Sequence, residues 1–179
     1  MRDRLQLLPE LPFADGKPKA AVLVPLFEDE ADELRVVLIK RPDTMPTHAG
    51  HIAFPGGRPN PEDRDPIHTA LREAFEEVGI PEEAVEIIGF LPVIDTVESP
   101  LLVHPVVGVF DRTVKLELSP REVTRVHTPR LLDLAESDRW VFEIWRDHRV
   151  WFFDLDGDVL WGATAWMVRR LVGLDPLRD

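Results

Sequence analysis

The chain has 179 residues and a formal net charge of −12 at pH 7, and 44% of its residues are hydrophobic. This length predicts one domain with a sizeable core, and the charge argues against nonspecific nucleic-acid binding, which needs a basic surface. The absence of cysteine excludes disulfides, thiolate metal sites and thiol nucleophiles. No apolar run approaches the ~20 residues needed to cross a bilayer, and the acidic, proline-containing start is atypical of a secretory signal. We therefore expect a cytoplasmic protein that binds neither nucleic acid nor membranes.

The first third of the chain predicts an arm followed by a β-hairpin. Residues 1–17 contain leucines broken by prolines and are expected to form an N-terminal arm. Residues 19–27 and 34–40 are apolar enough for buried strands, and the acidic segment between them predicts a turn. Residues 41–50, with prolines and a glycine, predict a loop that leads through a short extended piece at 51–54 into Pro55-Gly56-Gly57.

The next segment predicts a helix with two different faces. Asp65 is a suitable N-cap, Pro66 suits the first helical position, and Gly79 suits the left-handed residue that ends a helix. At 100° per residue, one side gathers the acidic residues Glu73, Glu76 and Glu77. The other side is expected to face the core and carries Ile67, Ala70, Leu71, Ala74, Phe75 and Val78.

The second half of the chain alternates short strands with two helices. Residues 85–96 and 101–110 predict strands, and the prolines at 92 and 105 favour edge positions or bulges. Residues 117–126 predict a turn and a strand, 129–135 a short helix, 140–144 and 150–155 a hairpin, and 160–172 a C-terminal helix. Together these elements predict one mixed α/β domain with an inserted helix, without regular βαβ repeats.

The three glutamates on one helix face suggest a metal site. A charged helix face is usually just solvent-exposed, but like charges three and four residues apart repel, and Arg72 offers only one counter-charge. The helix also follows a Gly-Gly pair, where a ligand can approach the backbone closely. Clustered hard oxygen ligands suit Mg²⁺ or Mn²⁺ that bridges substrate phosphates.

The same stretch resembles the signature of the Nudix family, GX₅EX₇REUXEEXGU, where U is aliphatic. Gly57 matches its first glycine, and Arg72 to Ile80, REAFEEVGI, match its second half. The first half differs, because Asp63 replaces the glutamate and eight residues separate it from Arg72. This resemblance implies a Nudix-type α/β/α sandwich with a mixed β-sheet and a loop-helix-loop at 57–80. It also implies that residues 1–179 form a single domain.

A second resemblance narrows the branch. Residues 38–57 look like the motif that precedes the Nudix box in coenzyme A pyrophosphatases, and the matching residues are Arg41, His48, Gly50, Phe54, Pro55, Gly56 and Gly57. The C-terminal segment is similar to a WGxTA-type helix of that branch. Lys40, Pro42 and Met45-Pro46 depart from the motif. The implied reaction converts coenzyme A or a derivative to 3′,5′-ADP and 4′-phosphopantetheine. The alternatives are hydrolysis of ADP-ribose, another nucleotide sugar or a dinucleotide, and a non-catalytic nucleotide-binding module.

The resemblance also assigns roles to residues. Mg²⁺ or Mn²⁺ would be held by Glu73, Glu76, Glu77 and the Gly56 carbonyl. Candidates for the general base are Glu76, Glu122 and, less favoured, Glu98.

The remaining assignments concern substrate contacts and assembly. Arg41 and His48 would contact or shape the substrate site, and Arg72 would orient a carboxylate. The five tryptophans are expected to serve packing or an interface, although one could stack on a base. The protein could be a monomer or a homodimer.

Overall fold

The computed structural model of the protein describes residues 5–12, 19–96 and 101–177. Its strands are β1 (Lys19–Glu28), β2 (Leu34–Val36), β3 (Leu38–Lys40), β4 (Ile52–Ala53), β5 (Gly56–Gly57), β6 (Val85–Phe90), β7 (Ile94–Asp95), β8 (Leu102–Phe110), β9 (Arg125–His127), β10 (Val141–Trp145), β11 (His148–Leu155) and β12 (Asp158–Trp161). Its helices are α1 (Pro66–Val78), α2 (Leu131–Leu134) and α3 (Gly162–Leu171), with short 3-10 helices η2 (Glu82–Ala84) and η3 (Ser137–Arg139).

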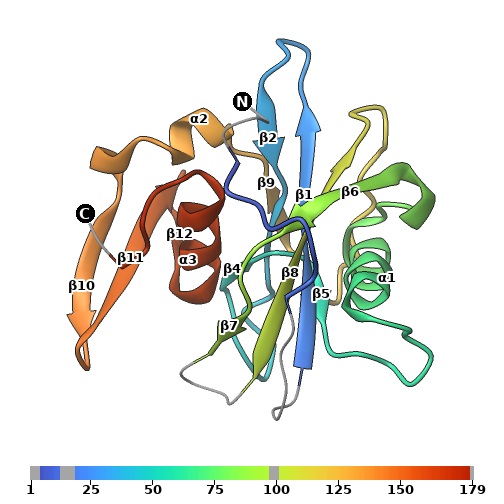
Figure 1. Cartoon of the computed structure of the whole chain (residues 1–179), viewed down its shortest axis with the longest axis horizontal. Coiled ribbons are helices and arrows are strands. Elements are labelled where there is room, and N and C mark those ends of the chain that lie inside the picture. The colour runs from blue at the N-terminus through green and yellow to red at the C-terminus, as the bar shows by residue number, and fades with distance from the viewer. Residues whose placement is uncertain (1–4, 13–18, 97–100, 178–179) are drawn as a thin grey trace.

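The largest sheet is mixed. Its strand order is β2-β1-β8-β6, with β5 added to β1 and β7 added to β8. The pairing of β1 with β8 is parallel, whereas the other pairs are antiparallel. Two three-stranded sheets, β4-β3-β9 and β10-β11-β12, complete the strands. Figure 1 shows α1 and α3 on opposite sides of the central strands, so the predicted mixed α/β fold is confirmed.

The predicted strand at residues 34–40 is divided between two sheets. Only β2 continues the hairpin with β1, whereas β3 pairs with β4 and β9. The reason is that β5 takes the same edge of β1 further along, where Leu23 N donates to Pro55 O at 2.9 Å. The backbone therefore leaves β1 after Val37, whose N–H donates to Pro25 O at 2.9 Å.

The expectation that both prolines lie at edges or bulges is wrong for Pro105. It lies inside β8, which has β1 on one side and β6 and β7 on the other. The Pro105 carbonyl accepts from Leu91 N at 3.1 Å, and in a strand the nitrogen of a residue faces the same neighbour as its carbonyl. At that point β6 has ended and β7 has not begun, so the missing N–H interrupts no continuous ladder.

The helix α1 has the predicted ends. Asp65 Oδ1 accepts from His68 N at 2.8 Å, and Gly79 adopts a left-handed φ of 73°. One expected core residue is wrong, because Phe75 is 58% exposed. The helix lies on β1 and β5, and its buried sector is rotated toward the glutamates, so that Glu77 is buried and Phe75 is not.

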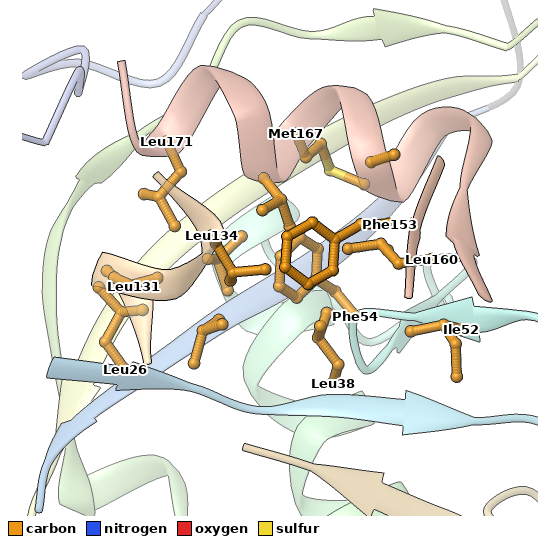
Figure 2. Close-up of a cluster of buried hydrophobic side chains, with 14 of the residues drawn as sticks. Leu26, Leu38, Ile52, Phe54, Leu131, Leu134, Phe153, Leu160, Met167 and Leu171 are labelled. Atoms are coloured by element: carbon orange, nitrogen blue, oxygen red, sulfur yellow. The ribbon is translucent and has the colours of Figure 1, made fainter. Parts of the chain in front are cut away.

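The main core lies between α3 and the strands beneath it (Figure 2). Met167 and Leu171 from α3 meet Phe54, Phe153 and the leucines labelled in the figure. Leu5 and Leu7 of the predicted arm pack against this core, and Leu8 forms an antiparallel backbone bridge with Phe90. None of the helices in the described ranges is long and apolar enough to span a membrane.

Candidate active site

Glu77 is the most enclosed carboxylate of the acidic helix face. Its side chain is 4% exposed, Gly56 N donates to its Oε2 at 3.0 Å, and Arg41 Nη1 lies 3.8 Å from its Oε1. Burial raises the pKa of Glu77 to about 8, and the negative charges of Glu73 and Glu122 act in the same direction. The contacts with Gly56 and Arg41 oppose this shift only in part. A negative charge on Glu77 is therefore unfavourable, and the contacts with Gly56 and Arg41 compensate for it only in part.

Arg72 holds the other carboxylates of the face in place. Its Nη2 lies 2.9 Å from Glu73 Oε1, and its Nη1 lies 3.2 Å from Glu76 Oε2. The same guanidinium donates to both oxygens of Asp63 and to Arg58 O. This geometry agrees with the expected role of Arg72 as a residue that orients carboxylates.

Asp63 serves the loop before α1. Its side chain is 1% exposed and accepts from Asn60 N, Thr69 Oγ1 and Arg72. The Arg72 guanidinium holds the pKa of this carboxyl well below its usual range. Because its oxygens are committed to these donors, Asp63 tethers the loop to the helix through Arg72. Asp63 in place of glutamate and the one-residue-longer loop thus still allow an ion pair with Arg72, in which the Asp63 side chain is buried.

A loop far along the chain brings Glu122 to the same place. Glu117 N donates to Val78 O at 3.0 Å and Ser119 N donates to Glu77 O at 2.9 Å, which fastens residues 117–119 to the end of α1. Glu122 follows in the turn, where its N–H donates to Ser119 O. Its charge raises the pKa values of both Glu73 and Glu77. The structure thus brings this candidate to the acidic face, whereas Glu98 lies outside the described residues.

Gly56 and Gly57 lie so close to neighbouring atoms that a Cβ at either position would clash with them. A Cβ on Gly57 would lie 2.5 Å from the Glu73 carboxylate, and a Cβ on Gly56 would meet the backbone of Ala21 and Val22. Gly57 is therefore needed for the position of a site carboxylate, and Gly56 for the pairing of β5 with β1.

The loop at residues 42–50 is closed at its neck by Arg41 and His51. Arg41 N donates to His51 O at 3.0 Å. The Nε of Arg41 is buried and has no hydrogen-bond acceptor among the described residues. His48 is exposed, has a φ of 53°, and its ring centroid lies 5.4 Å from that of His51. Arg41 therefore reaches the acidic face, whereas His48 lies on the outer side of the loop.

The carboxylate oxygens of this face are suitable ligands for a divalent metal, although in this structure they contact Arg72 and Gly56. Glu73 and Glu77 lie against Gly57 and Gly56, and Glu76 is joined to Glu73 through Arg72. Hard oxygens of this kind suit Mg²⁺ or Mn²⁺. In the part of the chain that the structure describes, no three acidic, histidine or cysteine side chains are arranged so that they could hold a metal ion. The reason lies in the ion pairs of Arg72 with Glu73 and Glu76 and in the bond from Gly56 N to Glu77. The metal ligands therefore remain a prediction.

Some features of the site have no clear signal in the local sequence. His51 lies beside Trp161, with ring centroids 4.8 Å apart, and Asp63 pairs with Arg72 although the spacing differs from the usual motif.

Comparison with known proteins identifies the family of the chain. The family model for the NUDIX domain matches residues 17–155. The chain is 40% identical over 168 residues to the Nudix hydrolase NudL of Enterobacter sp. (strain 638), which covers 90% of this chain and 86% of that protein. Among solved structures, a NUDIX hydrolase from Alicyclobacillus acidocaldarius has a TM-score of 0.57 at 17% identity, covering 88% of this chain and 92% of that one. The C. elegans Ap4A hydrolase in a binary complex has a TM-score of 0.54 at 24% identity, covering 65% and 82%. The extent of the family match and the 40% identity show that the chain belongs to the Nudix hydrolase family.

Proposed function

We propose that this protein is a metal-dependent pyrophosphohydrolase that cleaves a nucleoside diphosphate linked to another moiety, with coenzyme A or a derivative as its substrate. The products would be 3′,5′-ADP and 4′-phosphopantetheine. The observation that carries this proposal is that Glu73 and Glu77 lie against Gly57 and Gly56 of β5. Arg72 joins Glu76 to Glu73, and Glu122 is close enough for its charge to raise the pKa values of Glu73 and Glu77.

The charge of the cluster supports the metal requirement. Burial and mutual repulsion raise the pKa values of Glu73 and Glu77, so a cation placed among them would relieve unfavourable charge. We assign the ligands to Glu73, Glu76, Glu77 and the Gly56 carbonyl. A bound Mg²⁺ or Mn²⁺ would supply neutralisation of the diphosphate and a more acidic water.

The remaining residues position the reactants. Arg72 aligns Glu73 and Glu76 with its two Nη atoms. We assign the general base to Glu76, which is half-exposed and can exchange a proton with solvent, or to Glu122, which follows the turn docked on α1. Either carboxylate would accept a proton from the attacking water.

The loop before the turn supports the choice of substrate. The Nη1 of Arg41 lies 3.8 Å from Glu77 Oε1, and its buried Nε has no acceptor among the described residues. A phosphate oxygen is one of the acceptors whose geometry matches a guanidinium. We assign Arg41 to the phosphates. His48, whose position in the loop matches the coenzyme A pyrophosphatase motif, is assigned to the outer part of the substrate.

A substrate panel tests the proposal. Coenzyme A, an acyl-coenzyme A, ADP-ribose, a dinucleoside polyphosphate and an oxidised nucleotide are incubated with Mg²⁺ or Mn²⁺, and the products are identified by mass. Coenzyme A species should give the highest kcat/KM and yield 3′,5′-ADP. A much higher kcat/KM for ADP-ribose would overturn the choice of substrate, and nucleotide binding without turnover of any compound would indicate a non-catalytic module.

Variants test the metal assignment. Glu76→Gln and Glu77→Gln should each lower kcat by orders of magnitude, because each removes a negative oxygen from the cluster. Glu83→Gln is the matched control, since Glu83 is an exposed residue of η2 on the surface. Unchanged activity in both cluster variants would remove the support for metal chemistry at this face.

A further inference from the structure

One side of the β10-β11-β12 sheet carries exposed aromatic and aliphatic side chains. Side chains alternate along each strand, and the register Val141↔Phe152 and Phe152↔Trp161 puts these three residues on one side of the sheet. Trp145 shares that side and is 44% exposed, while Val141 is 63% exposed. The opposite side faces the core through Trp151, Phe153 and Leu160. On the first side, Phe152 and Trp161 are half-buried and Trp161 contacts His51, while Trp145 and Val141 remain exposed.

Three rings on this exposed side converge, and we name Trp145, Phe152 and Trp161 the aromatic platform. The ring centroids of Trp145 lie 6.1 Å from Phe152 and 5.8 Å from Trp161. Phe152 and Trp161 are nearly parallel, with 14° between their planes and 6.3 Å between centroids. The indole of Trp145 is held by a hydrogen bond from its Nε1 to Glu143 Oε2 at 2.9 Å. The rings of the platform therefore have defined orientations relative to one another.

The aromatic platform begins beside the candidate active site. The register of β3 and β4 pairs Lys40 with Ile52, so Arg41 lies opposite His51, to which its N–H donates. Directly opposed residues of an antiparallel pair have side chains on the same side, with Cβ atoms ~5 Å apart. Arg41 extends to Glu77 at 3.8 Å, and His51 contacts the Trp161 ring at a centroid distance of 4.8 Å. One surface therefore runs from the acidic face through Arg41 and His51 to the platform, as β4 and β12 contact each other.

We propose that the aromatic platform binds the nucleobase of the substrate while the diphosphate lies at Arg41 and the acidic face. This inference rests on the proposed function, because it places one end of the same substrate. A nucleobase fits the platform chemically, since its planar π-face stacks on indole and phenyl rings and its edge remains in water. In Figure 1 the platform strands lie on the far side of β4 from α1, so a bound nucleotide would extend along β4.

The side chain of Trp145 offers the cleanest test. It is exposed at the end of β10, so its replacement leaves the core intact. Trp145→Ala should raise the KM for the coenzyme A substrate about tenfold with little change in kcat, because a stacking contact of this kind is worth that factor. Trp145→Phe should largely retain the KM, whereas Trp145→Leu should not, since only an aromatic ring stacks. Ile144→Ala is the matched control, because Ile144 is 60% exposed on the opposite side of the same strand.

Direct binding separates this inference from the proposed function. Calorimetry with 3′,5′-ADP should give a Kd about tenfold weaker for Trp145→Ala than for the native protein, and inorganic pyrophosphate should bind both equally. This measurement needs no turnover, so it stands even if the choice of substrate is wrong.

Two results would overturn the placement of the base. One is an unchanged KM and Kd in Trp145→Ala. The other is a change in sedimentation of Trp145→Ala without a change in nucleotide binding, which would make the platform a contact between copies of the chain.

Discussion

Replacing Gly57 by alanine should inactivate the enzyme without unfolding it. The added Cβ would lie 2.5 Å from both Cδ and Oε1 of Glu73, whereas ordinary contact begins near 3.4 Å. The Glu73 carboxylate must therefore withdraw by about 1 Å. A displacement of that size in a reacting constellation can lower the rate about 100-fold, so we expect kcat/KM to fall by that factor. The clash involves the end of a flexible side chain, so the melting temperature should stay within about 2 °C of the native value.

Gly56→Ala is the contrasting control for this prediction. Its Cβ would meet the backbone of Ala21 and lie 2.6 Å from Val22 Cα. The backbone of β1 cannot yield as a side chain does, so we expect the free energy of unfolding to drop by about 3 kcal/mol. Steady-state kinetics and urea titration of both variants separate the two effects. Native kcat/KM in a folded Gly57→Ala protein would refute the assignment of Glu73 to the reacting cluster.

Two further predictions concern the carboxylates around α1. Asp63→Asn should lower the free energy of unfolding by about 2 kcal/mol in urea titration, because Arg72 loses a buried charged acceptor. The pKa of Asp63 is lowered from the ordinary 3.8, so its stabilisation is present above pH ~4 and lost as the pH falls toward the lower native pKa. The native protein should therefore lose stability over that range, and Asp63→Asn should lose less. An equal loss of unfolding free energy with falling pH in both proteins would contradict the assignment. Glu122→Gln should lower kcat/KM at least about tenfold while thermal stability holds or rises, because a charge that repels Glu73 and Glu77 is removed; native kinetics would exclude Glu122 as the base.

The sequence predicted what local chemistry determines. The limits of α1 follow from Asp65, Pro66 and Gly79, which act on neighbouring backbone groups, and all three act as expected. The glutamates of this helix and Glu122 are close in space, as the resemblance implied. These features needed only the helical period, the cap residues and one family motif.

What the sequence could not predict depends on contacts between distant segments. The backbone leaves the first sheet after Val37 because β5 occupies the edge of β1. Pro105 is tolerated because β6 and β7 leave a gap beside it. Phe75 is exposed because the contact of α1 with β1 and β5 rotates the helix toward Glu77. Each outcome is set by which strands become neighbours, and the hydrophobic periodicity of one segment does not say which distant segment pairs with it.

The departure at Asp63 from the usual motif has a physical explanation that the structure makes testable. The usual signature has a glutamate at this position and seven residues between it and the arginine. Here the side chain is one methylene shorter and the loop is one residue longer, and the carboxylate still accepts from Arg72 Nη2 at 3.0 Å. The two differences should therefore compensate each other.

A double-mutant cycle measures this compensation. Asp63→Glu alone should destabilise by about 1–3 kcal/mol, because the site is 1% exposed and has no room for a methylene. Deletion of the exposed Arg64 alone should also destabilise, since it moves the aspartate out of reach of Arg72. Together the two changes restore the usual spacing. The double variant should therefore lose less unfolding free energy than the sum of the losses in the two single variants, by at least about 1 kcal/mol. Strict additivity in urea titration would mean that loop length and side-chain length are independent, and that the Asp63–Arg72 pair is not what the longer loop serves.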